Sequence, residues 1–159
     1  MPFGALKKFS IGVLPNFDEK SHGLYFADFH PTYPDFQKWL NTKVIPETIQ
    51  NPTQRDVIFA LSSDNSSIAG FSILKNTALE KKICSFYIVP AFQKMGYGSS
   101  LMEECFKILG TSTPMITMPQ KCKDLFKNLL SKYGFEFKHE LSNYYVDGET
   151  ECVFNGILH

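Results

Sequence analysis

The chain has 159 residues, of which 43% are hydrophobic and 20% are charged, a balance typical of a globular domain rather than of a disordered chain. Sixteen basic residues offset sixteen acidic ones, so there is no overall positive charge of the kind that attracts nucleic acids or anionic membranes. No apolar run reaches the roughly 20 residues that a membrane-spanning helix needs. We therefore predict one domain over residues 1–159 that binds neither nucleic acid nor membrane.

The four cysteines lie far apart in the sequence, at positions 84, 105, 122 and 152, and they form no CxxC pair. No histidine lies at a zinc-ligand spacing from any of them. The sequence also begins without the pattern of a secretory signal peptide. These observations predict a cytoplasmic protein that has no disulfide framework and needs no metal.

The first part of the chain predicts a short strand over residues 10–14 and then an amphipathic helix that begins at Pro34. Pro46 is expected to end this helix, because proline lacks the backbone N–H that a helix interior requires. Between these two elements lies an aromatic stretch over residues 25–34. The helix is indicated by apolar residues at helical spacing, which are Phe36, Trp39, Leu40 and Val44.

Three runs rich in β-branched and aromatic residues follow, over residues 55–61, 68–75 and 79–89. Residues 62–67 form a polar turn between the first two runs. Consecutive strands joined by short polar segments usually pair with each other. The three runs therefore predict an antiparallel meander.

The next element is a helix over residues 99–109, where Ser100 and Glu103 have the spacing of a capping box. Gly110 is expected to end it. The sequence then predicts a strand over 115–118, a helix over 121–133 and two strands over 135–145 and 151–158, which meet at the turn Asp147-Gly148.

The most informative segment is residues 86–99, in which a strand ends at Pro90 and a loop with Gly96 and Gly98 leads into the helix. Glycines let the backbone N–H groups approach a ligand, and the helix N-terminus adds further donors and a positive dipole end. Lys94 would add charge from the loop, and Ser99 or Ser100 would add a hydroxyl donor. The segment is thus a candidate pyrophosphate site, although a glycine pair alone also suits an ordinary turn.

The six residues from Gln93 to Gly98 resemble the signature of the GNAT superfamily of N-acetyltransferases, which is Gln or Arg, two residues, Gly, one residue, then Gly or Ala. Tyr133-Gly134-Phe135 is similar to the segment that follows the last helix of that family. The order of predicted elements from about residue 10 to 158 also agrees. The resemblance implies an α/β fold with a mixed, mostly antiparallel sheet of about seven strands and helices on both faces.

The resemblance also implies a function, namely acetyl transfer from acetyl-CoA to a primary amine by direct attack in a ternary complex. The acceptor would be a small molecule or a peptide, and the protein would be a monomer or homodimer. The backbone of residues 86–88 would flank the pantetheine arm, where two strands splay apart, and residues 94–99 would bind the pyrophosphate. The implied cofactor-binding residues are Phe86, Tyr87, Ile88, Gln93, Lys94, Met95, Gly96, Tyr97, Gly98 and Ser99.

The sequence departs from the family at both positions where catalytic groups are common. Leu130 stands where many members have a tyrosine that protonates the leaving thiolate, and Cys84 stands where many have a carboxylate. Tyr133 suits a place in the core, and Glu80 could act as a base through water or could simply be a solvated carboxylate at the end of a strand. The catalytic residues therefore stay unassigned.

These departures leave two alternatives open. Without an acid and a base, the chain could be a non-catalytic CoA-binding or regulatory module. It could also acylate a protein N-terminus or a lysine. By analogy with the family, the acceptor pocket would draw on the early aromatic residues Tyr25, Phe26, Phe29, His30, Tyr33, Phe36 and Trp39.

Overall fold

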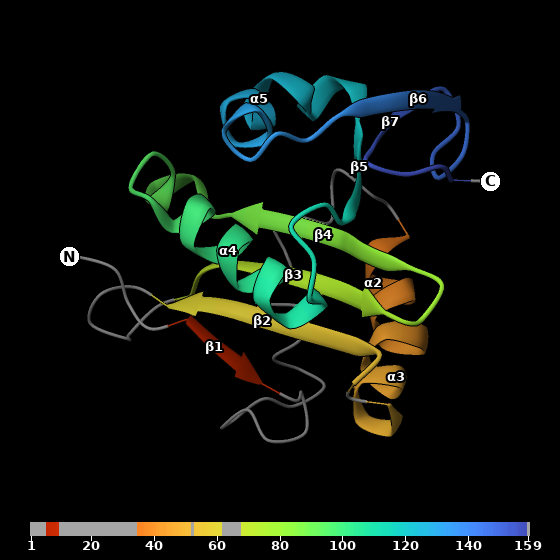
Figure 1. Cartoon of the computed structure of the whole chain (residues 1–159). Helices are drawn as coiled ribbons and strands as arrows, with labels where there is room; N and C mark the ends of the chain where they lie inside the picture. Colours follow the sequence, from red (N-terminus) through yellow and green to blue (C-terminus); the bar gives the residue numbers. More distant parts are fainter. Residues whose placement is uncertain (1–5, 10–34, 52, 62–67, 159) are drawn as a thin grey trace.

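The computed structural model describes residues 6–9, 35–51, 53–61 and 68–158. Its seven strands form one sheet in the order β1-β2-β3-β4-β5-β7-β6 (Figure 1), which confirms the predicted fold class and strand number. The elements are β1 (Leu6–Phe9), α2 (Phe36–Trp39), η3 (Leu40–Val44), α3 (Ile45–Gln50), β2 (Arg55–Leu61), β3 (Ile68–Asn76), β4 (Lys81–Ile88), η4 (Pro90–Phe92), α4 (Tyr97–Leu109), β5 (Met115–Pro119), η5 (Gln120–Cys122), α5 (Lys123–Lys132), β6 (Phe137–Ser142) and β7 (Thr150–Phe154).

The sheet is mostly antiparallel. Strands β2 to β4 pair in sequence order as the predicted meander, with Val57 opposite Ile73 and Phe71 opposite Tyr87, and β1 pairs antiparallel with β2 beside it. Strand β5 joins β4 in parallel, which is possible because helix α4 makes the crossover. Strands β6 and β7 then form the predicted hairpin beyond β5. The single parallel pair thus lies in the middle of the sheet.

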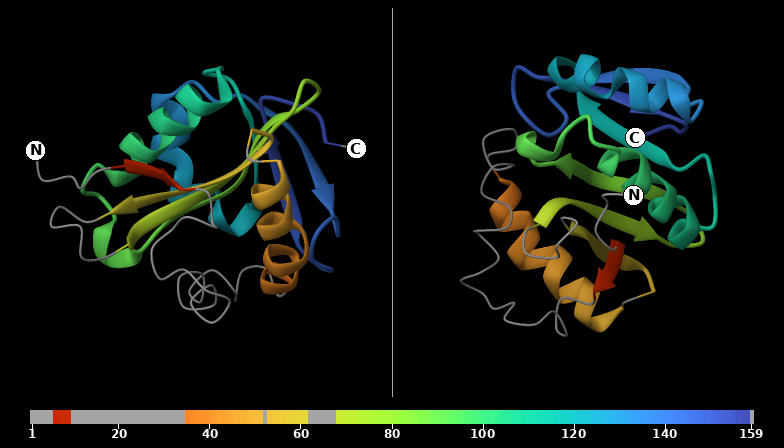
Figure 2. Two further views of the ribbon diagram at one scale, coloured as in Figure 1. Left: turned by 90° about the horizontal axis from the view of Figure 1, so that it is seen from below. Right: turned by 90° about the vertical axis from the view of Figure 1, so that its left-hand side faces the viewer.

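Helices cover both faces of the sheet, as Figure 2 shows. Helix α4 buries the side of Leu101, Met102 and Cys105 against one face, where α5 also packs. The segment α2-η3-α3 buries Leu40 and Val44 against the other face. Burial of each such large apolar side chain contributes about 1.5–3 kcal/mol. None of the helices in the described ranges is both long and apolar enough to cross a membrane.

The first helix runs further than predicted, because Pro46 does not end it. Residues Leu40–Val44 form a π-turn, in which the N–H of Ile45 donates to the carbonyl of Leu40. Pro46 follows at the start of α3, where a missing N–H costs little, so the helical path continues to Gln50. The predicted strand over residues 10–14 lies outside the described residues, and the first observed strand is Leu6–Phe9.

Helix α4 also begins earlier than predicted. It starts at Tyr97 with Gly96 as the N-cap and has no side-chain cap, so the expected capping box of Ser100 and Glu103 does not form. The left-handed backbone of Gly96 sets the helix start two residues before Ser99. Gly110 ends the helix in the left-handed conformation, as predicted.

Candidate functional site

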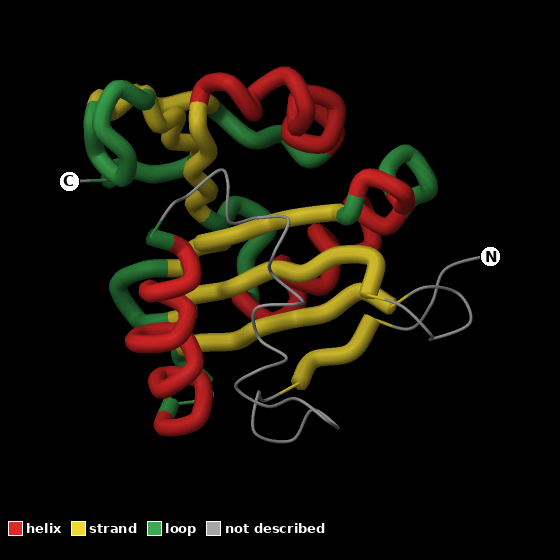
Figure 3. The backbone as a smooth tube through the Cα atoms, turned by 180° about the vertical axis from the view of Figure 1, so that it is seen from behind, coloured by secondary structure: helices red, strands yellow, loops and turns green. Residues whose placement is uncertain are grey.

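Strands β4 and β5 form a fork. They pair at only two positions, Lys82 with Met115 and Ile83 with Ile116, and β5 then follows β7 on its other edge as far as Pro119. The tube view shows β5 leaving the direction of β4 at this point (Figure 3). Among the described residues, no strand pairs with the side of β4 that faces the fork beyond Ile83. An extended ligand could therefore hydrogen-bond to strand backbone there.

A β-bulge lies at the base of the fork. Ile73 of β3 is opposite Ser85, whereas its neighbour Leu74 is opposite Ile83, so Cys84 is an extra residue on β4. The bulge lets Cys84 and Ser85, although consecutive, both line one pocket. Bulges re-aim side chains in this way near many active sites. The resemblance placed Cys84 at the position of the family's carboxylate, and the structure brings this thiol to the fork.

The loop between β4 and α4 has two residues in the left-handed region, Lys94 with a φ of 61° and Gly96 with a φ of 93°. The Gln93 side chain fixes the start of the loop, because its Nε2 donates to the Ile88 carbonyl over 3.2 Å. Two left-handed residues so close together turn the chain sharply, so that backbone N–H groups of the loop can approach an anion closely. The first turn of α4 begins directly after this loop. The loop fits a phosphate group by its backbone.

Gly98 is a glycine that the fold itself does not require. A β-carbon there would meet Leu129 Cδ2 at 3.9 Å and Ile88 Cγ1 at 4.0 Å, both ordinary contacts. Gly98 also lies inside α4, with no left-handed backbone. Neither packing nor backbone conformation therefore requires a glycine here, and the missing side chain would let a ligand approach the backbone closely.

The remaining predicted cofactor-binding residues differ in how they are exposed. Lys94 and Met95 are exposed beside the loop, and the Ser99 hydroxyl accepts a hydrogen bond from Lys132 Nζ at 2.9 Å. The side chains of Phe86 and Tyr97 are only 6% and 3% exposed. These two residues can therefore face a ligand with their backbone only, which is how the resemblance uses Phe86.

Both residues considered near the end of α5 have structural contacts. Leu130 is 5% exposed and belongs to the core beneath α4. The Tyr133 hydroxyl donates to the Ser99 carbonyl over 3.2 Å, and its ring packs edge-on against Phe106 with centroids 5.4 Å apart. Tyr133 is thus a partly buried tyrosine that packs against the core and ties α5 to the first turn of α4.

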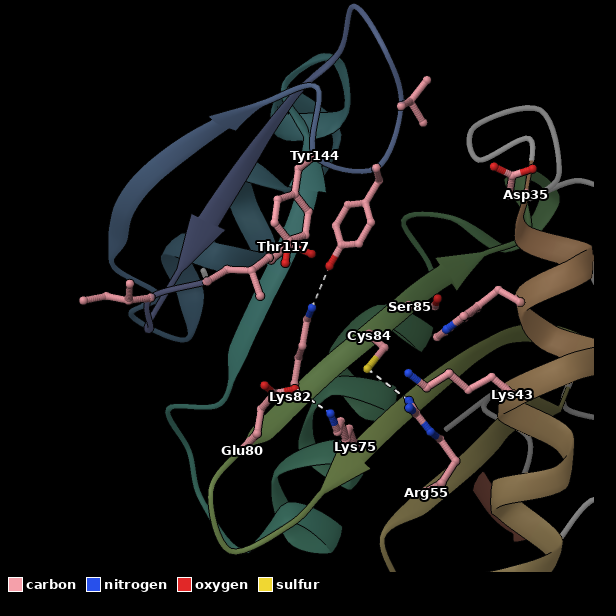
Figure 4. Close-up of a pocket in the computed structure, with 15 residues that line it drawn as sticks. Asp35, Lys43, Arg55, Lys75, Glu80, Lys82, Cys84, Ser85, Thr117 and Tyr144 are labelled. Atoms are coloured by element: carbon pink, nitrogen blue, oxygen red, sulfur yellow. Dashed lines mark hydrogen bonds and ion pairs between the residues drawn. The ribbon is translucent and has the colours of Figure 1, made fainter.

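A pocket of about 690 Å³ opens at the fork, on the face of the sheet that the first helix covers (Figure 4). Its walls are the first helix, strands β2 to β5, the loop between β6 and β7, and the C-terminal segment. Both arms of the fork reach it, β4 through Cys84 and Ser85 and β5 through Thr117. Trp39 also lines it. Of the other early aromatic residues that the sequence suggested for an acceptor pocket, Phe36 begins α2, and the rest lie outside the described residues, namely Tyr25, Phe26, Phe29, His30 and Tyr33.

Two of the basic residues that line the pocket are paired with carboxylates. Arg55 is 2% exposed, and its Nε lies 3.0 Å from Glu47 Oε2 while its guanidinium donates to the Cys84 sulfur over 3.3 Å. Lys75 Nζ lies 3.5 Å from the Glu80 carboxylate. Glu80 thus lines the pocket as an ion-pair partner of Lys75.

Lys82 is buried, and its Nζ donates to the Tyr145 hydroxyl over 3.0 Å. Burial acts to lower the pKa of Lys82, but Tyr145, Cys84 and Glu80 together raise it above its ordinary value. Lys82 is therefore a protonated ammonium in the pocket wall. The sequence analysis missed Arg55, Lys82 and Tyr145. A signal existed for Arg55 and Lys82, which are charged residues within largely apolar strands, whereas Tyr145 lies in a loop and gave none.

A family model of the GNAT acetyltransferases matches residues 16–112 of the chain. The chain belongs to the GNAT acetyltransferase family. The match spans the β4 strand, the Gln93 to Gly98 loop and all of α4. A search of curated proteins finds no match for this GNAT chain.

Solved structures with the same fold include several of this family. An acetyltransferase from Bacillus subtilis, in complex with CoA, aligns with a TM-score of 0.62 at 14% identity over 98% of this chain and 99% of that one. PaiA N-acetyltransferase from Thermoplasma acidophilum, in complex with coenzyme A, aligns with a TM-score of 0.60 at 17% identity over 96% and 98%. At these identities the likeness establishes the GNAT fold of this chain.

Proposed function

We propose that this GNAT chain is an acetyl-CoA-dependent N-acetyltransferase, that residues 1–159 form one acyltransferase domain, and that the acceptor is a primary amine. One observation carries the proposal. The β4–β5 fork has the glycine loop at the end of β4 and the pocket at its base, where Cys84, Ser85 and Thr117 lie. A donor with its phosphates at the loop and its extended arm in the fork would present its thioester to an acceptor in the pocket.

The loop and fork suit the parts of CoA in turn. Backbone N–H groups around Gly96, the first turn of α4 and the charge of Lys94 suit a pyrophosphate. The open β4 edge from Cys84 to Ile88 suits the amides of a pantetheine arm. When bound, acetyl-CoA supplies an acyl group that is already activated, so no enzyme nucleophile is needed.

The pocket residues can assist acetyl transfer without a general base. Lys43 and Lys82 line the pocket together, and positive charge nearby lowers the pKa of a bound ammonium group. A larger fraction of the acceptor is then the neutral amine that can attack. Positioning of the amine beside the thioester supplies the rest of the rate enhancement. The four cysteines are free thiols, which suits the cytoplasmic location expected from the sequence.

The test combines turnover with binding. Purified protein is mixed with acetyl-CoA and a panel of primary amines, and release of free CoA thiol is followed. We expect turnover with at least one amine, and a thermal melt that rises by about 5–10 °C at a hundredfold excess of acetyl-CoA over its Kd.

The two measurements separate the alternatives. A rise in melting temperature without thiol release on any amine would favour a non-catalytic CoA-binding module. No rise at millimolar acetyl-CoA would contradict the donor assignment itself. Turnover on peptides alone, with N-terminal or lysine amines, would favour a protein acetyltransferase.

A further inference from the structure

We propose that the amine acceptor also carries a carboxylate, and that Lys82, with Tyr145, binds it. This inference rests on the proposed acetyl transfer, because it names the class of acceptor that the same pocket takes. It follows from the charge balance of the pocket and from the placement of one buried ammonium group relative to the fork.

Lys82 is the central observation. Lys82 is only 6% exposed, yet among the described residues its ammonium group forms no ion pair, and its hydrogen-bond partner is the Tyr145 hydroxyl, at 3.0 Å. The Tyr145 ring lies 5.6 Å from the same nitrogen. A buried charge is normally paired with an opposite charge, because desolvation otherwise costs several kcal/mol. An ammonium group has three donors, so Lys82 retains capacity for an anionic partner that comes from outside.

The other charges of the pocket reinforce this reading. Arg55 and Lys75 have carboxylate partners in Glu47 and Glu80, whereas Lys43 reaches from the first helix toward Cys84 in Figure 4. Among the described residues that line the pocket, the remaining carboxylate that could offset the positive charges of Lys43 and Lys82 is that of Asp35. Asp35 is exposed and lies directly before the first helix. The pocket is therefore net positive, and a polycationic acceptor would be repelled from it.

The spacing along β4 sets the size of the acceptor. Lys82 and Cys84 are two residues apart on β4 and both line the pocket, and in a regular strand the backbones of two such residues are about 7 Å apart. An acceptor whose carboxylate contacts Lys82 would thus place its amine near the base of the fork if only a few bonds separate the two groups. A compact amino acid meets this condition, whereas an amino acid whose amine lies many bonds from its carboxylate does not.

The experiment measures charge preference apart from catalysis. In the presence of CoA, the protein is titrated calorimetrically with N-acetyl derivatives of glycine, leucine and glutamate, each as the free acid and as the C-terminal amide. We expect at least one acid to bind about tenfold or more tightly than its amide. Equal affinity for the members of every pair, or no binding of any acid, would overturn the inference.

Variants identify the residue responsible. Lys82→Met keeps the apolar stem and should abolish the preference, while Lys82→Arg should retain most of it. Lys81→Met is the matched control, because Lys81 is the exposed neighbour on the same strand and does not line the pocket. A preference that survives in Lys82→Met, with circular dichroism showing that all three variants are folded, would assign the carboxylate to another residue and overturn the proposal.

Turnover is then measured on the free amino acids and on their amides. An acid preference in binding without acetylation of any of them would contradict the proposed function and leave the carboxylate site intact. Acetylation of acids and amides at equal kcat/KM would support the proposed acetyl transfer and contradict the carboxylate site.

Discussion

The two ends of the β4–β5 fork are built in different ways. The end toward α4 is formed by a short continuous segment, from Phe86 to Ser99, and its groups suited to a ligand are mostly backbone N–H groups. The pocket end is formed by side chains from the first helix, four strands and two C-terminal segments, between residues 35 and 158. A donor common to a whole family can be bound by backbone, whereas an acceptor particular to each member needs side chains.

This difference predicts which changes affect which ligand. Substitutions in the loop should weaken CoA binding and leave acceptor preference unchanged. Substitutions in the pocket should alter acceptor preference and leave CoA binding unchanged.

The largest effect is expected for Gly96→Val. The φ of 93° at Gly96 is strained for a β-branched residue, so the loop should move and its N–H groups should no longer meet two phosphates. A charge-assisted hydrogen bond is worth roughly 1.5–3 kcal/mol, and loss of two should weaken CoA binding by about a hundredfold or more. Calorimetric titration of CoA measures this.

The matched control is Gly110→Ala, at the other end of the same helix. Gly110 also has a positive φ, of 71°, and a β-carbon there would meet nothing within 4 Å. This variant should lose about 1 kcal/mol of stability and bind CoA like the parent. If Gly96→Val is folded and binds CoA normally, the loop is an ordinary turn, and the proposal that its backbone binds the CoA phosphates is wrong.

Gly98→Ala should have the next largest effect, about tenfold on CoA affinity. The added methyl group makes only ordinary contacts with Leu129 and Ile88, and alanine favours the helix by up to about 1 kcal/mol over glycine. The variant should therefore be at least as stable as the parent while the methyl group obstructs the ligand. Unchanged affinity in titrations of CoA would show that the space beside Gly98 has no role in binding.

The same contrast explains what the sequence could predict. The fold, the meander and the glycine loop follow from local patterns: an apolar run rich in β-branched and aromatic residues over 55–61, helical spacing around Leu101, and glycines at fixed offsets from Gln93. The predicted helix end at Pro46 was wrong, because a π-turn precedes it and Pro46 lies at the start of α3, where a backbone N–H is not needed. The pocket could not be predicted, because the contact of Lys82 with Tyr145 joins residues 63 positions apart and depends on how the sheet folds.

Glu80→Gln tests the pocket end with a smaller expected effect, a loss of less than about tenfold in turnover. Glu80 lines the pocket but is paired with Lys75, and Gln removes the charge while keeping the shape. Loss of a general base usually costs about a hundredfold or more. Steady-state rates with saturating acetyl-CoA decide the matter, and a loss above a hundredfold with CoA affinity retained would make Glu80 the base.

The smallest catalytic effect is expected for Tyr133→Phe, which separates a core role from a role as an acid. The hydroxyl donates to the Ser99 carbonyl, so its removal should cost about 1 kcal/mol of stability, or roughly 2–4 °C in Tm. The ring contact with Phe106 should persist in the variant, because phenylalanine keeps the ring. We expect kcat within about threefold of the parent and no change in the pH dependence of kcat, since a residue that protonates the leaving thiolate would alter both. A fall of a hundredfold in kcat at unchanged Tm would place the Tyr133 hydroxyl at the reacting atoms, and acid catalysis would then come from the CoA end of the fork rather than from the pocket.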